Sequence, residues 1–386
     1  MPLCGDQHGD AMNEDKSARY NRLKRQWSMM STAWSACLLV VLALTAGSRT
    51  LRDVAERVAH LIAPAGWERS AAIATCITLL VALNELGSLP IGFYGGYLLD
   101  TRYGVSKQTL ASWCSDQAKS FLLGLVLTIA AGRLLYAFVD AMPDTWWLPA
   151  GIAFALVVIG LANVAPLILM PLFYSVKPLT RESLRARLVT LAERAGAHVL
   201  DAYEWGLGQK TTKANAALTG IGRSRRILVS DTMLEQYSED EIEVVLAHEL
   251  AHHVHGDIWK GIAFEAALIL AGFFAAAHLL VTLAPVVGFN GPADLAGLPV
   301  LVLAAGAVSL IALPAAHAMS RAHERSADRF ALNLTQNPGA FVSAMKRLGA
   351  QNLAEDEPSQ LVQWLFYSHP PIRERIAAAR EFRGRT

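Results

Sequence analysis

Long apolar segments dominate this sequence and restrict the folds open to it. They run over about residues 34–46, 70–94, 121–139, 148–173, 262–287 and 295–316. Most are close to the roughly 20 residues that a helix needs to cross the hydrocarbon core of a bilayer. Because lipid offers no partner for backbone N–H and C=O groups, such segments span the membrane as helices. We therefore expect a mainly α-helical, multi-pass membrane protein with about six transmembrane helices.

The composition agrees with this expectation and limits the classes of partner that the protein is expected to bind. Hydrophobic residues make up 53% of the 386 residues and charged residues only 17%, whereas an ordinary soluble domain has about 25% charged residues. The 34 Lys and Arg residues against 33 Asp and Glu residues leave a net charge of only +1. Since no global charge attracts a polyanion, we expect membrane lipid and no nucleic acid among the partners.

The alternation of polar and apolar stretches divides the chain into three parts. A polar, disordered-looking tail covers residues 1–30, and an N-terminal membrane domain with about four spans covers residues 31–175. The third part, residues 176–386, is polar except for a two-span hairpin at about 262–316. Neither of its polar blocks holds enough apolar residues to close a core, so we expect both to form one α+β domain.

Lys and Arg residues near the spans predict the orientation, because cytoplasmic loops are enriched in them. Residues 16–25 include five basic residues, whereas the linkers 140–147 and 288–294 include none. This pattern places the N-terminus, the polar block 176–260 and the C-terminus in the cytoplasm. The loop with Arg52 and Arg69 disagrees, although acidic neighbours partly balance it.

A helix with a metal-binding pattern is predicted from about residue 239. Ser238 and Glu241 form a capping box before it, and His248-Glu249-x-x-His252 follows. The i, i+4 spacing puts both imidazoles on one helix face, where they can share a zinc ion, and it directs Glu249 toward a metal-bound water. The same pattern also fits a solvated polar helix face.

A catalytic zinc needs a third protein ligand and an open position for water. The HExxHxxGxxH arrangement fails, because residue 255 is His and residue 258 is Ile. An intramembrane site fails as well, because the polar stretch SEDEIEVV precedes the motif. The remaining possibility for the third ligand is a carboxylate on a later helix, on which Glu324 and Asp328 share one face. Asp328 can accept a hydrogen bond from the outer nitrogen of a ligating histidine.

These motifs resemble those of the type I CAAX prenyl proteases and their bacterial relatives, which include the heat-shock membrane protease group. The resemblance rests on HELAHH at 248–253, Glu324-x-x-Ala-Asp328, SHPPIRERI at 368–376, NAALTG at 215–220 and LPIGFYGGYLLDTRYGVSKQTL at 89–110. It covers about residues 70–380. The upstream block favours the prenyl-protease branch.

The resemblance implies a zincin-like catalytic domain with one zinc ion per chain and three ligands, His248, His252 and Glu324. It implies Glu249 as the general base and His369 as a group that faces the transition state. The stretch around Asn215 and Ala216 would be an edge strand that pairs with extended substrate. These proteases enclose a chamber with seven spans, whereas this chain offers about six. The short loops and the bacterial relatives favour a bacterial inner membrane.

We therefore expect a zinc-dependent endopeptidase with Glu249 and His369 as catalytic groups. It would hydrolyse membrane-associated or misfolded proteins or CAAX-like peptides at the cytoplasmic membrane face. The alternative is a transporter or channel in which Glu85 and Arg133 line a conduction path and HExxH is a regulatory metal site. That alternative leaves Glu324 and His369 unexplained.

Overall fold

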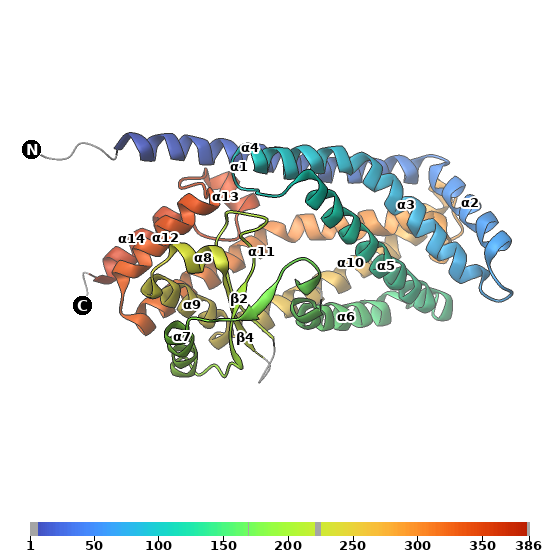
Figure 1. Ribbon diagram of the computed structural model, residues 1–386. Coiled ribbons are helices and arrows are strands. Elements are labelled where there is room, and N and C mark those ends of the chain that lie inside the picture. The colour runs from blue at the N-terminus through green and yellow to red at the C-terminus, as the bar shows by residue number, and fades with distance from the viewer. Residues whose placement is uncertain (1–6, 169, 221–224, 384–386) are drawn as a thin grey trace, which may run out of the picture.

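Helices dominate the structure, a computed structural model that describes residues 7–168, 170–220 and 225–383. In chain order the elements are α1 (Gln7–Leu44), α2 (Gly47–Ile62), α3 (Glu68–Gly92), α4 (Leu99–Arg102), α5 (Leu110–Ala141), α6 (Trp147–Ile168), β1 (Val176–Pro178), α7 (Glu182–Arg194), β2 (Asp201–Trp205), β3 (Ala216–Thr219), β4 (Arg226–Ser230), α8 (Asp231–Gln236), α9 (Glu239–Val254), α10 (Asp257–Val287), α11 (Leu298–Thr335), α12 (Pro338–Asn352), α13 (Gln360–Phe366) and α14 (Ile372–Arg383). In Figure 1, α12 and α14 lie toward the left, the sheet lies below the middle, and α2, α3 and α5 extend to the right.

The prediction of a multi-pass, mainly helical membrane protein is confirmed. Five described helices are long and apolar enough to cross a membrane, and they cover Lys16–Leu44, Glu68–Arg102, Leu110–Ala141, Asp257–Val287 and Leu295–Thr335. A shorter apolar helix, Trp147–Ala162, lies where the sequence predicts the span 148–173. Small residues let these helices approach closely. At Gly132 of α5, for example, an added Cβ would lie 2.1 Å from Cδ1 of Ile77 on α3.

The first helix begins earlier than the sequence indicates. Residues 1–30 read as a disordered-looking tail, but α1 already starts at Gln7, and residues 1–6 lie outside the described part. Contacts with the C-terminal part of the chain stabilise the early turns of this helix. Asn21 Nδ2 donates a hydrogen bond to the Leu353 carbonyl at 2.7 Å, and Arg25 forms an ion pair with Glu355 at 2.5 Å. The sequence could not show these contacts, because their partners lie more than 300 residues further along the chain.

A four-stranded sheet with the order β1-β2-β4-β3 lies within residues 176–230. Strands β2 and β4 are parallel, whereas β1 and β3 pair antiparallel to β2 and β4, respectively. The resemblance implied a strand around Asn215 and Ala216, and β3 begins at Ala216. Within the described part of the chain, β3 pairs only with β4 in this sheet, so its other edge has no strand partner there.

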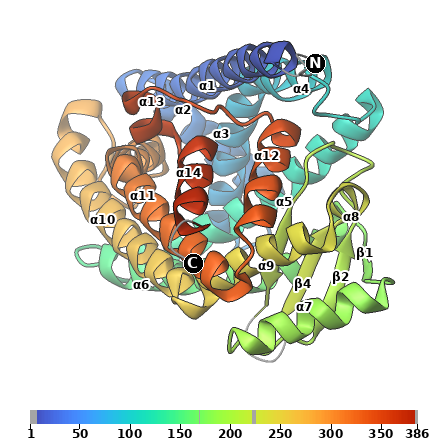
Figure 2. The ribbon, with the colours of Figure 1, turned by 90° about the vertical axis from the view of Figure 1, so that its left-hand side faces the viewer.

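Helix α9 lies between the sheet and α11 (Figure 2). The predicted capping box begins it, since Ser238 Oγ accepts a hydrogen bond from the Glu241 N–H and the Ser238 N–H donates to Glu241 Oε2 at 2.8 Å. Ile242, Leu246 and Leu250 are fully buried along one side of α9. This buried side fixes the rotation of the helix, so the face with the two histidines points toward α11.

Candidate metal centre

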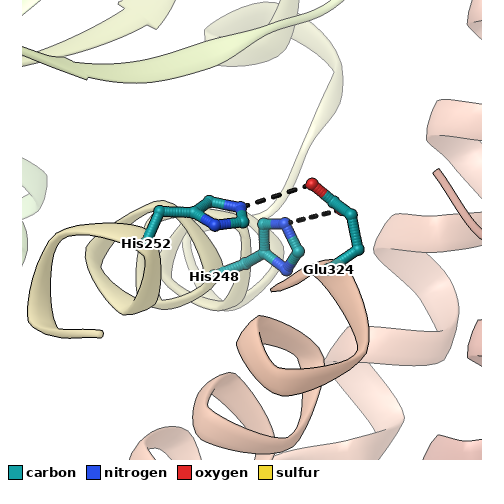
Figure 3. Close-up of side chains that lie close together, drawn as sticks. All are labelled: His248, His252 and Glu324. Carbon is teal, nitrogen blue, oxygen red and sulfur yellow. Dashed lines mark ion pairs between the residues drawn. The ribbon is translucent and has the colours of Figure 1, made fainter. Parts of the chain in front are cut away.

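Three predicted ligands come together from two helices. His248 and His252 lie on α9, and Glu324 lies on α11 (Figure 3). His248 Nε2 is 3.2 Å from Glu324 Oε2, and His252 Nε2 is 3.3 Å from Glu324 Oε1. Among the described residues, this is the only group of three or more His, Cys, Asp and Glu side chains whose ligand atoms all lie within 4.8 Å of one another.

The separations between these ligand atoms fit a zinc ion. With metal–ligand bonds of about 2.0–2.1 Å, the corners of a zinc tetrahedron lie roughly 3.3–3.4 Å apart, close to the observed distances of 3.2 and 3.3 Å. The buried Oε2 of Glu324 is at ion-pair distance from His248, yet it has no hydrogen-bond partner in the described part of the chain. A shared cation would satisfy this oxygen. Two imidazoles and one carboxylate also form a ligand set used by catalytic zinc.

Each histidine has a carboxylate behind its outer nitrogen. Asp328 Oδ1 lies 2.8 Å from His248 Nδ1, as expected from the sequence. Asp257 Oδ2 lies 3.1 Å from His252 Nδ1, and sequence reasoning missed it. Gly256, with φ of +66°, turns the chain between α9 and α10 and lets Asp257 fold back onto His252. Such carboxylates fix the tautomer that leaves Nε2 free for a metal.

Arg375 of α14 is a further residue that the sequence analysis did not single out, although it lies within SHPPIRERI. Its guanidinium binds both oxygens of Asp328, at 2.8 and 2.6 Å. It also lies 3.9 Å from Glu324 Oε2. Burial by itself lowers the pKa of Arg375, but the charge and hydrogen bonds of Asp328, together with the charges of Glu324 and Glu249, outweigh burial and raise the pKa. The cation thus partly balances two buried carboxylates next to the metal centre.

The charges around His248 favour a cation at the site. Burial alone lowers the pKa of His248, but the hydrogen bonds to Asp328 and Glu324 outweigh it and raise the pKa to about 9. Without a metal the imidazole therefore holds a proton, and a binding metal ion must displace it. The same carboxylates that retain the proton would attract the metal ion.

Glu249 lies beside the three ligands without being one of them. Its side chain lines the same cavity, and it forms no ion pair or hydrogen bond in the described structure. Burial raises the pKa of the Glu249 carboxyl, although His248 and His252 act in the opposite direction. A carboxylate with a raised pKa and free oxygens is suited to accept a proton near neutral pH.

The cavity in front of the metal centre has a volume of about 360 Å³ and is lined by all the predicted site residues except Asp328. His369 reaches it from the segment before α14, with Nε2 3.3 Å from Glu324 Oε1. Ser368 Oγ lies 2.9 Å from His369 Nδ1. Asp328 is outside the cavity because it lies behind His248. Glu85 and Arg133 do not line the cavity, and they do not pair with each other in the described structure.

Asn215, which precedes β3, and Ala216, its first residue, also line the cavity. The Asn215 carbonyl accepts a hydrogen bond from the Ser230 N–H at 2.9 Å, and the Asn215 N–H donates to Ser230 Oγ. The backbone groups of Asn215 are thus directed toward β4. Because hydrogen-bonding direction alternates along an antiparallel strand, the N–H and C=O of Ala216 point to the open edge. Ala216 therefore offers its backbone to an extended partner.

Fold and site together define a class, a multi-pass membrane protein with a possible metal site built on an HExxH helix. Comparison with known families identifies the particular one. Residues 178–383 match the model of peptidase family M48, and residues 7–175 match the model described as the CAAX prenyl protease N-terminal region with five membrane helices. The chain belongs to peptidase family M48, and it is a membrane metalloprotease rather than a transporter.

Individual relatives agree with this assignment. The chain is 31% identical over 307 residues to "Uncharacterized metalloprotease YhfN" of Bacillus subtilis, which covers 78% of this chain and 72% of that protein. It is 25% identical over 389 residues to CAAX prenyl protease 1 of Saccharomyces cerevisiae, covering 94% and 84%. The crystal structure of S. mikatae Ste24p shares the fold, with a TM-score of 0.82 at 23% identity over 98% of this chain and 91% of that one. The resemblance seen in the motifs is confirmed.

Proposed function

We propose that this chain is a zinc-dependent endopeptidase with one zinc ion per chain, bound by His248, His252 and Glu324. The main support is the set of ligand-atom separations, 3.2 and 3.3 Å, which suits a tetrahedral ion. Asp328 and Asp257 hold the two imidazoles in the orientation that a metal requires. When bound, zinc would polarise the scissile carbonyl and lower the pKa of a water molecule.

Glu249 is the proposed proton carrier. Its carboxylate removes a proton from the attacking water as the new C–O bond forms, and it delivers that proton to the amine nitrogen as the C–N bond breaks. The raised pKa of Glu249 suits both steps, because the group must first accept the proton and then release it. The absence of a pairing partner in the described structure leaves its oxygens available.

His369 is the proposed donor to the oxyanion that develops on the scissile carbonyl. A hydrogen bond from the Ser368 hydroxyl to Nδ1 would place the imidazole proton on Nε2. That nitrogen faces the metal centre at 3.3 Å from Glu324. Pro370 and Pro371 follow directly and restrict the backbone of this segment.

The substrate is proposed to bind as an extended strand along β3, with Ala216 supplying the backbone hydrogen bonds and Asn215 lying beside it. Backbone pairing accepts many sequences, which suits membrane-associated or misfolded proteins as substrates. The names of the CAAX prenyl protease relatives support CAAX-like peptides as a second class.

The active site is proposed to lie at the cytoplasmic face of a bacterial inner membrane. The length of α11 supports a site outside the hydrocarbon core, because Glu324 lies about 39 Å beyond Leu298 at 1.5 Å per residue, past a core of roughly 30 Å. The Lys and Arg residues near the spans support the cytoplasmic side. We propose six spans, with four in a membrane domain at 31–175 and two interrupting the catalytic domain at 176–386. Reporter fusions after Thr386 test the orientation. An active periplasmic reporter at this position would reverse it.

Metal removal tests the proposed activity. Purified protein should contain one zinc ion, cleave an unfolded test peptide, lose cleavage when the metal is chelated and recover it when zinc is restored. A protein that cleaves equally well without any bound metal would contradict the proposal. Comparing a peptide with a CAAX-like end and the same peptide with that end truncated would show which substrate class is preferred.

A further inference from the structure

Two arginines from two membrane helices hold the chain segment that precedes His369. We call residues 363–369 the His369 segment. Arg321 of α11 donates from one guanidinium nitrogen to the carbonyls of Gln363 and Tyr367, at 3.0 and 2.6 Å. Arg321 is buried. Because the same helix provides Glu324, this contact ties the His369 segment to one ligand of the metal centre.

Arg25 of α1 holds the same segment from the other side. Its Nη1 atom lies 2.5 Å from Glu355 Oε2 and donates to the Tyr367 hydroxyl at 2.8 Å. The Tyr367 hydroxyl in turn donates to Glu355 Oε2 at 2.5 Å. Burial, with the Glu355 carboxylate beside it, raises the pKa of Tyr367, so the hydroxyl keeps the proton that it donates. The three groups form a closed hydrogen-bonded set.

This set is screened from water and lies close to the active site. The side chains of Arg25 and Glu355 are only 16% and 13% exposed, and partly buried, charge-assisted hydrogen bonds are among the stronger ones. Glu355 and Tyr367 line the cavity that contains the metal centre. Tyr367 is two residues before His369, so a shift of the tyrosine moves the imidazole.

We infer that Arg25 is a positioning residue for catalysis: through Glu355 and the Tyr367 hydroxyl it holds the His369 segment in the place where His369 faces the metal centre. The inference rests on the proposed role of His369. Arg25 forms no direct contact with Glu249 or with the three proposed ligands, so it acts through the segment alone. The membrane helix α1 is thereby a part of the catalytic arrangement, far from the HExxH helix in sequence.

Loss of Arg25 should impair the chemical step more than substrate binding. Glu355 would lose its cation and Tyr367 one of its partners, and the segment could relax. A displacement of about 1 Å at a catalytic group can cost on the order of 10²-fold in rate. Because Arg321 would still hold the backbone, we expect Arg25→Ala to lower kcat by about 10-fold, with little change in KM and no loss of zinc.

Three companion variants separate positioning from general damage. Arg25→Lys should retain most of the activity, because both contacts are made by one nitrogen, which an ammonium can replace. Tyr367→Phe should reproduce much of the loss. Arg22→Ala is the matched control, since Arg22 is an exposed basic residue on the same helix with no hydrogen bond or ion pair in the described structure, and it should behave like the wild type.

A double-mutant cycle with His369→Ala decides the inference. If Arg25 acts through His369, then adding Arg25→Ala to His369→Ala should lower kcat no further. Additive losses in zinc-loaded, folded protein, or a wild-type kcat for Arg25→Ala, would overturn the inference while leaving the proposed function intact. If His369→Ala itself kept the wild-type kcat, the proposed role of His369 would fall, and the inference with it.

Discussion

Asp257 and Asp328 are the carboxylates that contact the outer nitrogens of the two histidines, and neutralising either should weaken zinc binding. The contacts in the structure predict which of the two losses is larger. Substitution by Asn keeps the size of Asp257 or Asp328 and leaves an oxygen that can accept from the imidazole, but it removes the negative charge. Losses of such outer partners usually cost about 10- to 100-fold in metal affinity, or roughly 1.4–2.7 kcal/mol. Asp257→Asn should lie at the low end, because its contact with His252 is 3.1 Å long and the exposed Lys260 shares the carboxylate at 3.0 Å.

Asp328→Asn should lie at the high end and also destabilise the fold. Its contact with His248 is shorter, at 2.8 Å, and both of its oxygens bind Arg375, whose side chain is only 10% exposed. Weakening a buried ion pair from one side costs up to about 3–5 kcal/mol. Competition with a chromophoric zinc chelator measures the affinity, and thermal unfolding in detergent measures stability. Asp201→Asn, a carboxylate paired with Arg185 away from the site, is the control. Equal zinc affinities for both variants and the wild type would refute the reasoning.

Three further predictions concern the third ligand, the edge strand and the helix cap. Glu324→Ala should lose zinc while the control Glu374→Ala, an exposed carboxylate nearby, keeps it, and full metal content in Glu324→Ala would require another ligand. Ala216→Pro should raise KM for peptides without loss of zinc, because it removes an N–H directed to the open edge, whereas Ala217→Pro should destabilise the sheet by breaking the β3–β4 pairing. Burial alone would raise the pKa of Glu241, but hydrogen bonds from Ser343 and Ser238 and the charge of Arg347 hold it below its ordinary value. Since the folded-state pKa is lowered, this stabilisation is present above the unfolded pKa of about 4.3 and disappears as the pH falls through the folded value. The difference in melting temperature between the wild type and Glu241→Gln should therefore be large at pH 7 and shrink below about pH 4, and a constant difference would contradict it.

The sequence predicted the parts of the fold that depend on local patterns. Apolar segments of spanning length marked the membrane helices, and Ser238 with Glu241 marked the start of α9, because each feature is determined by neighbours a few residues apart. The short strand β1 has three residues and is held only by its pairing with β2, so its own sequence gives little sign of it.

The part of the metal centre that depends on a sequence spacing was predictable. The i, i+4 spacing predicts that His248 and His252 lie on one helix face, and the hairpin formed by α10 and α11 brings Glu324 close to them. Asp257 and Arg375 were missed because their roles come from tertiary geometry, namely the turn at Gly256 and the packing of α14 beside α11. The sequence did not predict that α1 is helical before residue 30, for a similar reason: Asn21 and Arg25 contact residues of the C-terminal third.

The most direct test of the proposed mechanism is the zinc content and cleavage rate of Glu249→Gln, measured on the same purified sample. Gln has the size of Glu and can still form hydrogen bonds, but it cannot carry the proton. We expect one zinc ion per chain and a cleavage rate at least about 10²-fold below that of the wild type, the usual scale for losing a general base. A zinc-loaded Glu249→Gln protein that cleaves an unfolded peptide at the wild-type rate would contradict the mechanism.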